Sequence, residues 1–202
     1  MAAGTATAHP HVFIDGGIDF IVSQSNVLEA VKVTWRFDEF ETLYAMSANS
    51  IAKGANEQLS GIEVARLALF MTAASNEPVQ SAHLTLGNEA LPLSAADDFS
   101  ATLVDNRLEV TFVRPLMEPI SIDGRVVEAS FHEATYFYAF SLTDPSELIG
   151  DQGDCSASTV QFEADKETEE LKEVLSSLGR EETPDIENVG ALFADRITVT
   201  CG

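Results

Sequence analysis

Short segments in which apolar and polar residues alternate dominate this chain. Alternation over His11–Val22 and Val27–Phe37 predicts two strands, and Ser23–Asn26 between them has the composition of a turn. These segments therefore predict a first hairpin. Gly16-Gly17 interrupts the first alternation and predicts a bulge or bend there.

Most of the second half of the sequence also has a strand pattern. Three two-residue turns, Gly87-Asn88, Asp105-Asn106 and Asp123-Gly124, each separate two alternating segments and predict hairpins. Further strands are expected at Tyr136–Leu142, Ser156–Phe162 and Arg196–Cys201, with a short structured segment at Val189–Phe193.

Two segments have a helical pattern instead. Ser60-Gly61-Ile62-Glu63 has the form of a capping box, and apolar residues follow it at helical spacing, so an amphipathic helix is predicted at Gly61–Ala74. Lys166–Leu178 is polar and charged, ends at Gly179 and predicts a second helix. Thr42–Ser60 shows no clear period and is expected to be a loop with one or two helical turns.

Many short strands with few helices predict a mainly β (α+β) fold, a β-sandwich-like domain with one amphipathic helix after the first hairpin and one polar helix near the C-terminus. Residues 9–202 are long enough for one domain with its own core, built either as a single unit or as two subdomains, 9–75 and 76–202. Residues 1–8 lack the apolar centre of a signal peptide, but Ala6-Thr7-Ala8 has the small-x-small form that precedes a cleavage point. We interpret residues 1–8 as the end of a removed leader or as an added start.

The net charge narrows the range of partners. Acidic residues number 33 against 11 basic ones, which gives −22 at pH 7. Nucleic acids and anionic lipids bind to basic surfaces, so neither is an expected partner, whereas cations are favoured. Adaptation to high salt accounts for such acidity equally well. No stretch is long and apolar enough to cross a bilayer, so membrane insertion is not expected.

The chain has two cysteines, Cys155 and Cys201, each beside a predicted strand. We expect one disulfide, which would tether the C-terminus and indicate an oxidising compartment. Two buried thiols in a cytosolic protein are the alternative.

Two of the four histidines lie close together at the start of the first strand, in His9-Pro10-His11-Val12-Phe13-Ile14-Asp15. Alternation places His9, His11, Phe13 and Asp15 on one face of an extended chain. Two imidazoles on one face suit zinc, copper, nickel or cobalt better than calcium or magnesium. Solvated histidines at a loose terminus are the simpler interpretation.

Further ligands have to come from elsewhere in the chain. His132 and Glu133 lie between two predicted strands and would complete a site if folding brought them to His9 and His11. The alternative is an ordinary turn over His132–Thr135, with the nearby tyrosines packing on a half-buried face.

An acidic cluster follows the only tryptophan. Asp38, Glu39 and Glu41 are candidate ligands, partners that orient the histidines, or the solvated end of a strand. His83 is more typical of a structural or exposed histidine. The sequence has no Gly-rich phosphate loop and no G-x-S-x-G motif, and no catalytic residues are expected.

Four features together resemble a known family: the His-Pro-His-Val-Phe-Ile-Asp opening, Trp35-Arg36-Phe37-Asp38-Glu39, the aromatic run Tyr136–Phe140, and Phe193-Ala194-Asp195 leading to Cys201. The family is the domain-of-unknown-function family numbered one thousand and seven, whose members are described as periplasmic components of ABC-type transport systems. The resemblance implies export to the periplasm, a Cys155–Cys201 disulfide, and a role beside transporters of nickel, cobalt or zinc.

The sequence thus leads to a functional hypothesis with one rival. We expect a periplasmic, non-catalytic protein that binds a divalent transition metal, with zinc favoured over nickel, cobalt or copper, and passes it to membrane transporter subunits. The expected ligands are His9, His11 and His132 with a carboxylate from Asp38, Glu39 or Glu133. If cleavage follows Ala8, the free amine of His9 is a further ligand, one suited to copper. The rival is an interaction module that docks a transporter subunit without metal.

Overall fold

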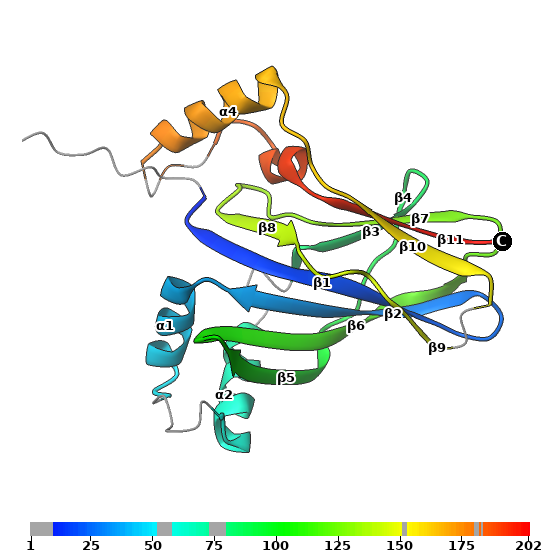
Figure 1. The fold of residues 1–202 in the computed structure, drawn as a ribbon, viewed down its shortest axis with the longest axis horizontal. Helices are drawn as coiled ribbons and strands as arrows, with labels where there is room; N and C mark the ends of the chain where they lie inside the picture. Colours follow the sequence, from blue (N-terminus) through cyan, green and yellow to red (C-terminus); the bar gives the residue numbers. More distant parts are fainter. Residues whose placement is uncertain (1–9, 52–57, 73–79, 151–152, 180–181, 183) are drawn as a thin grey trace, which may run out of the picture.

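Two β-sheets packed face to face form the core of the protein in the computed structural model (Figure 1). The structure describes residues 10–51, 58–72, 80–150, 153–179, 182 and 184–202. The first sheet, sheet A, has the strand order β5-β6-β2-β1-β8, and β9 also pairs with β1. The second, sheet B, has the order β10-β11-β7-β3-β4. The predicted sandwich-like α+β fold is confirmed.

The bounds of sheet A are β1 (Val12–Val22), β2 (Val27–Phe37), β5 (Asp97–Val104), β6 (Arg107–Ser121), β8 (Tyr138–Leu142) and β9 (Leu148–Gly150). Those of sheet B are β3 (Ala82–Leu86), β4 (Glu89–Ala90), β7 (Val126–Phe131), β10 (Cys155–Val160) and β11 (Arg196–Cys201). The helices are α1 (Glu39–Ala48), α2 (Gly61–Met71), α4 (Lys166–Ser177) and the 3-10 helix η1 (Val189–Phe193).

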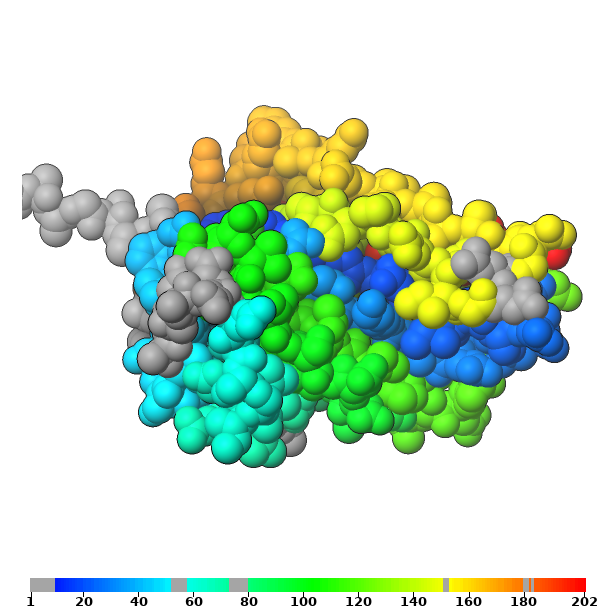
Figure 2. Space-filling model, turned by 60° about the horizontal axis from the view of Figure 1, so that its bottom comes forward, coloured from blue at the N-terminus to red at the C-terminus, as the bar shows by residue number. Residues whose placement is uncertain are grey.

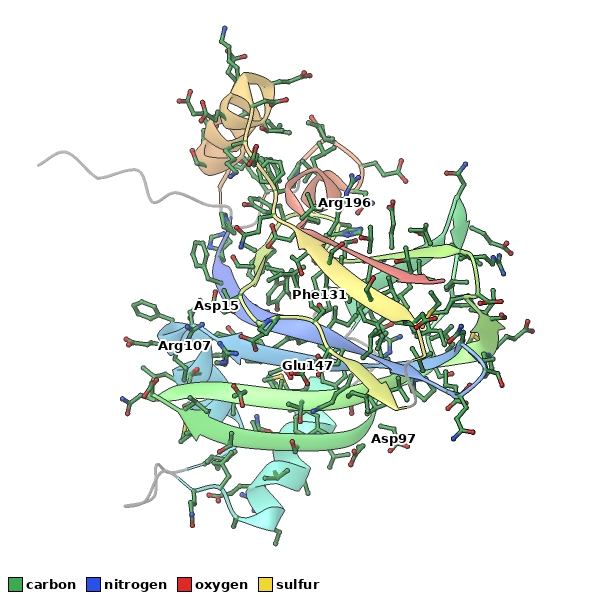
Figure 3. All side chains as sticks on the ribbon, turned by 45° about the vertical axis from the view of Figure 1, so that its right-hand side comes forward. Asp15, Asp97, Arg107, Phe131, Glu147 and Arg196 are labelled. Carbon is green, nitrogen blue, oxygen red and sulfur yellow. A yellow bond between two sulfur atoms is a disulfide. The ribbon has the colours of Figure 1, made fainter. Side chains whose placement is uncertain are left out.

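Aromatic side chains join the two sheets. The Trp35 ring, on β2, lies edge-on to Phe131 of β7 at a centroid distance of 5.7 Å, and it also contacts Phe112 and Phe140. Figure 3 shows Phe131 between the layers. Because β2 pairs with β6, the segments 9–75 and 76–202 contribute to one sheet and one core.

The alternation expected at the start of β1 is confirmed. Val12 and Ile14 are buried, whereas Phe13 is 54% exposed and Asp15 is partly exposed. The bulge expected at Gly16-Gly17 is wrong, because pairing with β2 continues through both glycines. Glycine is needed at position 16 because a Cβ atom there would collide with the carbonyl oxygen of Thr34 on β2.

The hairpin predicted at Asp123-Gly124 is also wrong. Strand β6 belongs to sheet A and β7 to sheet B, so this turn carries the chain from one layer to the other. The local turn is nevertheless real, since Gly124 has a positive φ of 61° and the Arg125 amide donates to Ile122. The hairpins at Gly87-Asn88 and Asp105-Asn106 are confirmed.

The capping box of α2 is present as predicted: Ser60 and Glu63 satisfy each other's backbone amides. The predicted polar helix is α4. A third helix, α1, lies within the acidic cluster and the stretch expected to be mostly loop. Its apolar period is obscured because Ala45 and Met46 are buried while Phe40 and Leu43 are exposed.

The expected disulfide is present and joins Cys155 to Cys201. These cysteines are direct partners across β10 and β11, so the bond fixes the edge strand of sheet B to the C-terminal strand. No helix in the described parts of the chain is long and apolar enough to cross a membrane.

Candidate functional site

A pocket of about 510 Å³ lies where the start of β1 meets α1. Its lining consists of His11, Val12, Phe40, Glu41, Tyr44, Phe137 and Tyr138. It therefore combines one imidazole and one carboxylate within aromatic walls. We refer to it as the His11 pocket.

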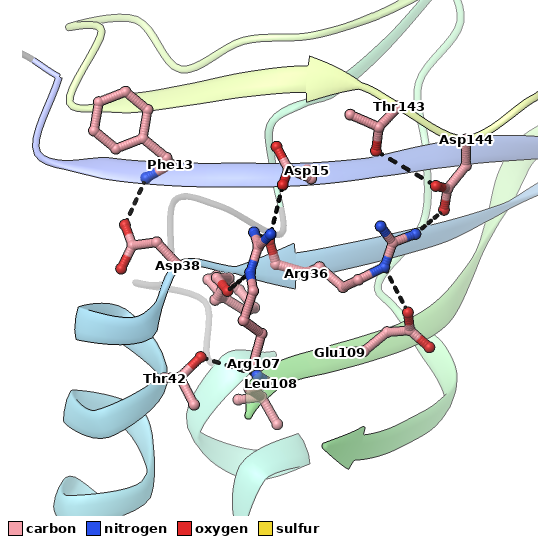
Figure 4. Close-up of polar contacts among 11 residues, drawn as sticks. Phe13, Asp15, Arg36, Asp38, Thr42, Arg107, Leu108, Glu109, Thr143 and Asp144 are labelled. Atoms are coloured by element: carbon pink, nitrogen blue, oxygen red, sulfur yellow. Dashed lines mark hydrogen bonds and ion pairs between the residues drawn. The ribbon is translucent and has the colours of Figure 1, made fainter. Parts of the chain in front are cut away.

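Asp38 holds two walls of the His11 pocket together. Its Oδ2 accepts a hydrogen bond of 2.9 Å from the Phe13 amide of β1, and its Oδ1 accepts one of 2.8 Å from the Glu41 amide of α1 (Figure 4). The Asp38 amide also donates to the Phe13 carbonyl at 3.0 Å. One side chain thus serves as the N-cap of α1 and fixes the helix to the strand next to His11.

The Glu41 carboxylate is half-buried in the first turn of α1. Burial raises its pKa, and the negative charge of Asp38 raises it further. A cation in the pocket would favour the ionised form of Glu41 and so reverse this effect.

His11 is fixed from the other side by the segment before β8. Its backbone amide donates to the Phe137 carbonyl at 2.9 Å, and its ring lies 4.8 Å from the Phe137 ring. His9, the other histidine of the opening motif, lies outside the described residues.

The structure does not place His132 and Glu133 in the His11 pocket. His132 follows β7, and its ring stacks on that of His83 at a centroid distance of 3.8 Å and an interplanar angle of 16°. Both histidines line a separate surface pocket of about 240 Å³ with Ser130, Glu128 and Arg196. Figure 3 shows Arg196 beside η1.

Glu133 is 6% exposed and is the centre of a turn. Its carboxylate accepts hydrogen bonds from the Thr135 amide, the Thr135 hydroxyl and the Phe137 amide at 2.7, 2.9 and 2.9 Å. These bonds give it a structural function that accounts for its burial.

The two acidic residues predicted as ligands also have defined positions. Asp38 accepts from the backbone amides of Phe13 and Glu41, and Glu39 is exposed in the first turn of α1. Across the described ranges, no group of three or more His, Cys, Asp or Glu side chains is arranged to hold a metal ion.

Sequence reasoning named Glu41 as one candidate in the acidic cluster but left it out of the expected ligand set, and it did not connect His83 with His132. An acidic N-cap three residues before a glutamate is a recognised helix start, so Asp38 and Glu41 carried a signal for α1. The histidine pair depends on β3 pairing with β7, which no local pattern reveals.

Two networks of arginines and acids connect strands of sheet A, and none of their residues lines the His11 pocket. Arg107 binds Asp15 at 2.7 Å and donates to the carbonyls of Arg36 and Phe37, while Arg36 binds Glu109 and Asp144 (Figure 4). Since each guanidinium is paired with at least one carboxylate, we assign these networks to holding β1, β2 and β6 in register.

Comparison with known proteins identifies the family of this chain but not its activity. No curated protein matches the sequence. The sequence model of one family, described as "Protein of unknown function (DUF1007)", matches residues 1–201. The chain therefore belongs to the DUF1007 family, as its opening motif and its Trp-x-Phe-Asp-Glu segment indicated.

Proposed function

We propose that this protein is a periplasmic accessory protein that binds a divalent transition metal in the His11 pocket and passes it to a membrane metal transporter. The observation that carries the proposal is the Asp38 carboxylate, which joins the strand next to His11 to the helix turn that holds Glu41. An imidazole and a carboxylate are thereby held at one pocket by a shared, fixed support.

The donor chemistry fits an ion such as zinc. Zinc accepts nitrogen from histidine and oxygen from glutamate, and nickel, cobalt and copper accept the same pair. His9, two positions before His11 in sequence, is the proposed third ligand. Three protein ligands leave a coordination position open, which suits a protein that must release its ion to a partner.

Two further properties support the proposal. The charge of −22 attracts cations to the surface. The Cys155–Cys201 disulfide is typical of proteins from oxidising compartments such as the periplasm.

Calorimetric titration of zinc chloride at pH 7.5 tests the ligand assignment. We expect Glu41→Gln and His11→Gln each to weaken zinc binding by about tenfold or more. Glu39→Gln is the matched control, because it removes the same charge from the same helix turn at an exposed position. Equal zinc affinity of the wild type, Glu41→Gln and His11→Gln would overturn the assignment.

An interaction module that docks a transporter subunit without metal is the second candidate. It is favoured by large apolar side chains at the same end of the molecule: Phe40, Leu43 and Tyr44 of α1 are 86%, 66% and 60% exposed. Figure 2 shows α1 and α2 at one end of the surface. Contiguous apolar surface of this kind is typical of binding sites for other proteins.

Thermal unfolding separates the two candidates. An ion that binds only the native state raises the melting temperature, and the rise grows with the logarithm of the ratio of ion concentration to Kd, whereas a docking surface alone gives no such rise. We expect added zinc to raise the melting temperature of the wild type but not that of the His11→Gln variant. An unchanged wild-type value would favour the docking module.

A further inference from the structure

The histidine pair joins two strands of sheet B to the turn that follows them. His83 lies on β3, and its Nε2 donates a hydrogen bond of 3.1 Å to the backbone carbonyl of His132. Because a carbonyl only accepts, Nε2 of His83 carries the proton in this arrangement. The Ser130 hydroxyl oxygen lies 3.3 Å from Nδ1 of His132, and the His132 amide donates a hydrogen bond of 3.0 Å to the Ser81 carbonyl.

The turn that begins at His132 is held from within by Glu133. The buried carboxylate accepts from Thr135 and from the Phe137 amide, and the Glu133 carbonyl accepts from the Tyr136 amide at 3.2 Å. Gly190 of η1 packs so closely on this turn that a Cβ atom there would collide with the Glu133 carbonyl oxygen. The turn therefore has little room to move as long as both ends stay in place.

Phe137 connects this turn to the His11 pocket. Its amide is bound by Glu133, its carbonyl accepts from the His11 amide, and its ring contacts the His11 ring. A continuous series of bonds thus runs from the His83–His132 stack through the turn to His11.

We propose that the stacked His83–His132 pair positions His11 through the 132–137 turn, and that acid releases this positioning by charging the stacked rings. The link to metal release rests on the function proposed above, whereas the link to His11 does not. His83 and His132 are positioning residues in this account, since neither lines the His11 pocket.

The groups around the pair allow this behaviour. Desolvation, together with the smaller effect of the charge of His83, lowers the pKa of His132 to about 4. Desolvation also lowers the pKa of His83, and the positive charge of Arg114 lowers it as well. The hydrogen bond to the His132 carbonyl raises the pKa of His83 and offsets part of this effect. Arg196 from β11 also lies in the pair's pocket, and Glu128 of β7 is the acid among the residues that line it. The rings are therefore neutral at pH 7 and repel each other once both are charged.

Hydrogen exchange measured by NMR tests the proposal without metal. The compared proteins are the wild type and a His83→Gln/His132→Phe variant, in which glutamine keeps a donor and phenylalanine keeps a flat ring but neither titrates. We expect the protection factors of the His11 and Phe137 amides in the wild type to fall roughly tenfold or more between pH 7 and pH 4, and those of the variant to stay nearly constant. The Ile18 amide, in the centre of β1, is the internal control for general loosening.

The outcomes distinguish this proposal from the metal proposal. The same fall in both proteins, or a fall at Ile18 equal to that at His11, would show that the pair does not control the pocket. A separate zinc titration from pH 7.5 to pH 4.5 asks whether the variant retains zinc to lower pH than the wild type. If neither protein binds zinc but only the wild type loses protection, the positioning stands and the metal function falls.

Discussion

Single residues determine how the protein responds to pH. His132 has a pKa of about 4 in the folded protein against 6.5 for an ordinary histidine. A lowered histidine pKa means that the unfolded state takes up the proton first as pH falls. The stabilisation from neutral His132 is therefore complete above about pH 6.5 and is lost as pH falls toward 4.

Replacing His132 should reduce this acid sensitivity. A shift of this size corresponds to a loss of roughly 2–3 kcal/mol of unfolding free energy between pH 7 and pH 4. We expect His132→Phe to lose less stability than the wild type between pH 7 and pH 4 by about this amount, because the titrating groups that do not interact with His132 cancel in the comparison. Urea unfolding at both pH values measures the difference, and equal losses would show that His132 does not titrate as described.

Gly16 offers a second test at a single position. A Cβ atom there would meet the Thr34 carbonyl oxygen, and the paired backbone cannot give way, so Gly16→Ala should cost more than about 3 kcal/mol. At Gly61, the first position of α2, an added Cβ atom would meet nothing within 4 Å, so Gly61→Ala should be neutral or slightly stabilising. Thermal melts of the two variants give the comparison, and similar stabilities would contradict the close approach of β1 and β2.

At the scale of elements, Asp38 both caps the N-terminus of α1 and binds the helix to strand β1, whereas an ordinary N-cap residue only caps its helix. Asp38→Ala removes the cap of α1 and the bond to the Phe13 amide, so we expect a loss of about 1–2 kcal/mol. Asp165→Ala on α4 is the matched control, since Asp165 also caps a helix by accepting from the N3 amide but lies far along the chain from His11. Zinc affinity should fall for Asp38→Ala but not for Asp165→Ala. A comparable fall for both variants would show that Asp38 does not support the zinc site specifically.

Which elements the sequence could predict depended on how local their determinants are. The capping box of α2 and the alternation of β1 are contained in a few neighbouring residues, and both were predicted correctly. Helix α1 was predicted only as one or two helical turns within a loop, because its outer face carries Phe40 and Leu43, which a helix of a globular protein would ordinarily bury. The same exposed residues are the evidence for a docking surface.

The pairing of elements was less accessible to sequence reasoning. The Asp123-Gly124 turn has hairpin chemistry but connects the two sheets, because β6 continues along β2 as far as Ser121. His132 was expected beside His11, yet β7 pairs with β3 and brings it to His83. Strand order in a sandwich is set by contacts between distant segments, and single-sequence patterns do not encode it.

At the scale of the whole molecule, the disulfide joins the edge strand β10 of sheet B to the C-terminal strand β11. Cys155 and Cys201 are separated by 46 positions, and a cross-link over such a loop stabilises by about 3–4 kcal/mol in the chain-entropy description. We expect the Cys155→Ser/Cys201→Ser variant to lose about this much unfolding free energy in urea. An equal loss on reduction of the wild type would confirm the cause, and no loss would show that β10 is held by its other contacts.

The charge of the whole molecule adds to any cation site on it. Because the chain has 33 acidic and 11 basic residues, the negative electrostatic potential of the protein attracts zinc ions to its surface in general. A measured zinc affinity therefore does not by itself locate a binding site. Salt screens this general attraction more strongly than binding by fixed ligands. Titrations at about 0.5 M sodium chloride should therefore retain the difference between wild type and Glu41→Gln while weak surface binding disappears.

The most direct measurement is a crystal structure of the zinc-loaded protein with anomalous data collected at the zinc absorption edge. Our account predicts one strong peak in the His11 pocket, within coordinating distance of the His11 ring and the Glu41 carboxylate. A peak at the His83–His132 pair instead, or no ordered peak in a protein fully exposed to zinc, would contradict it.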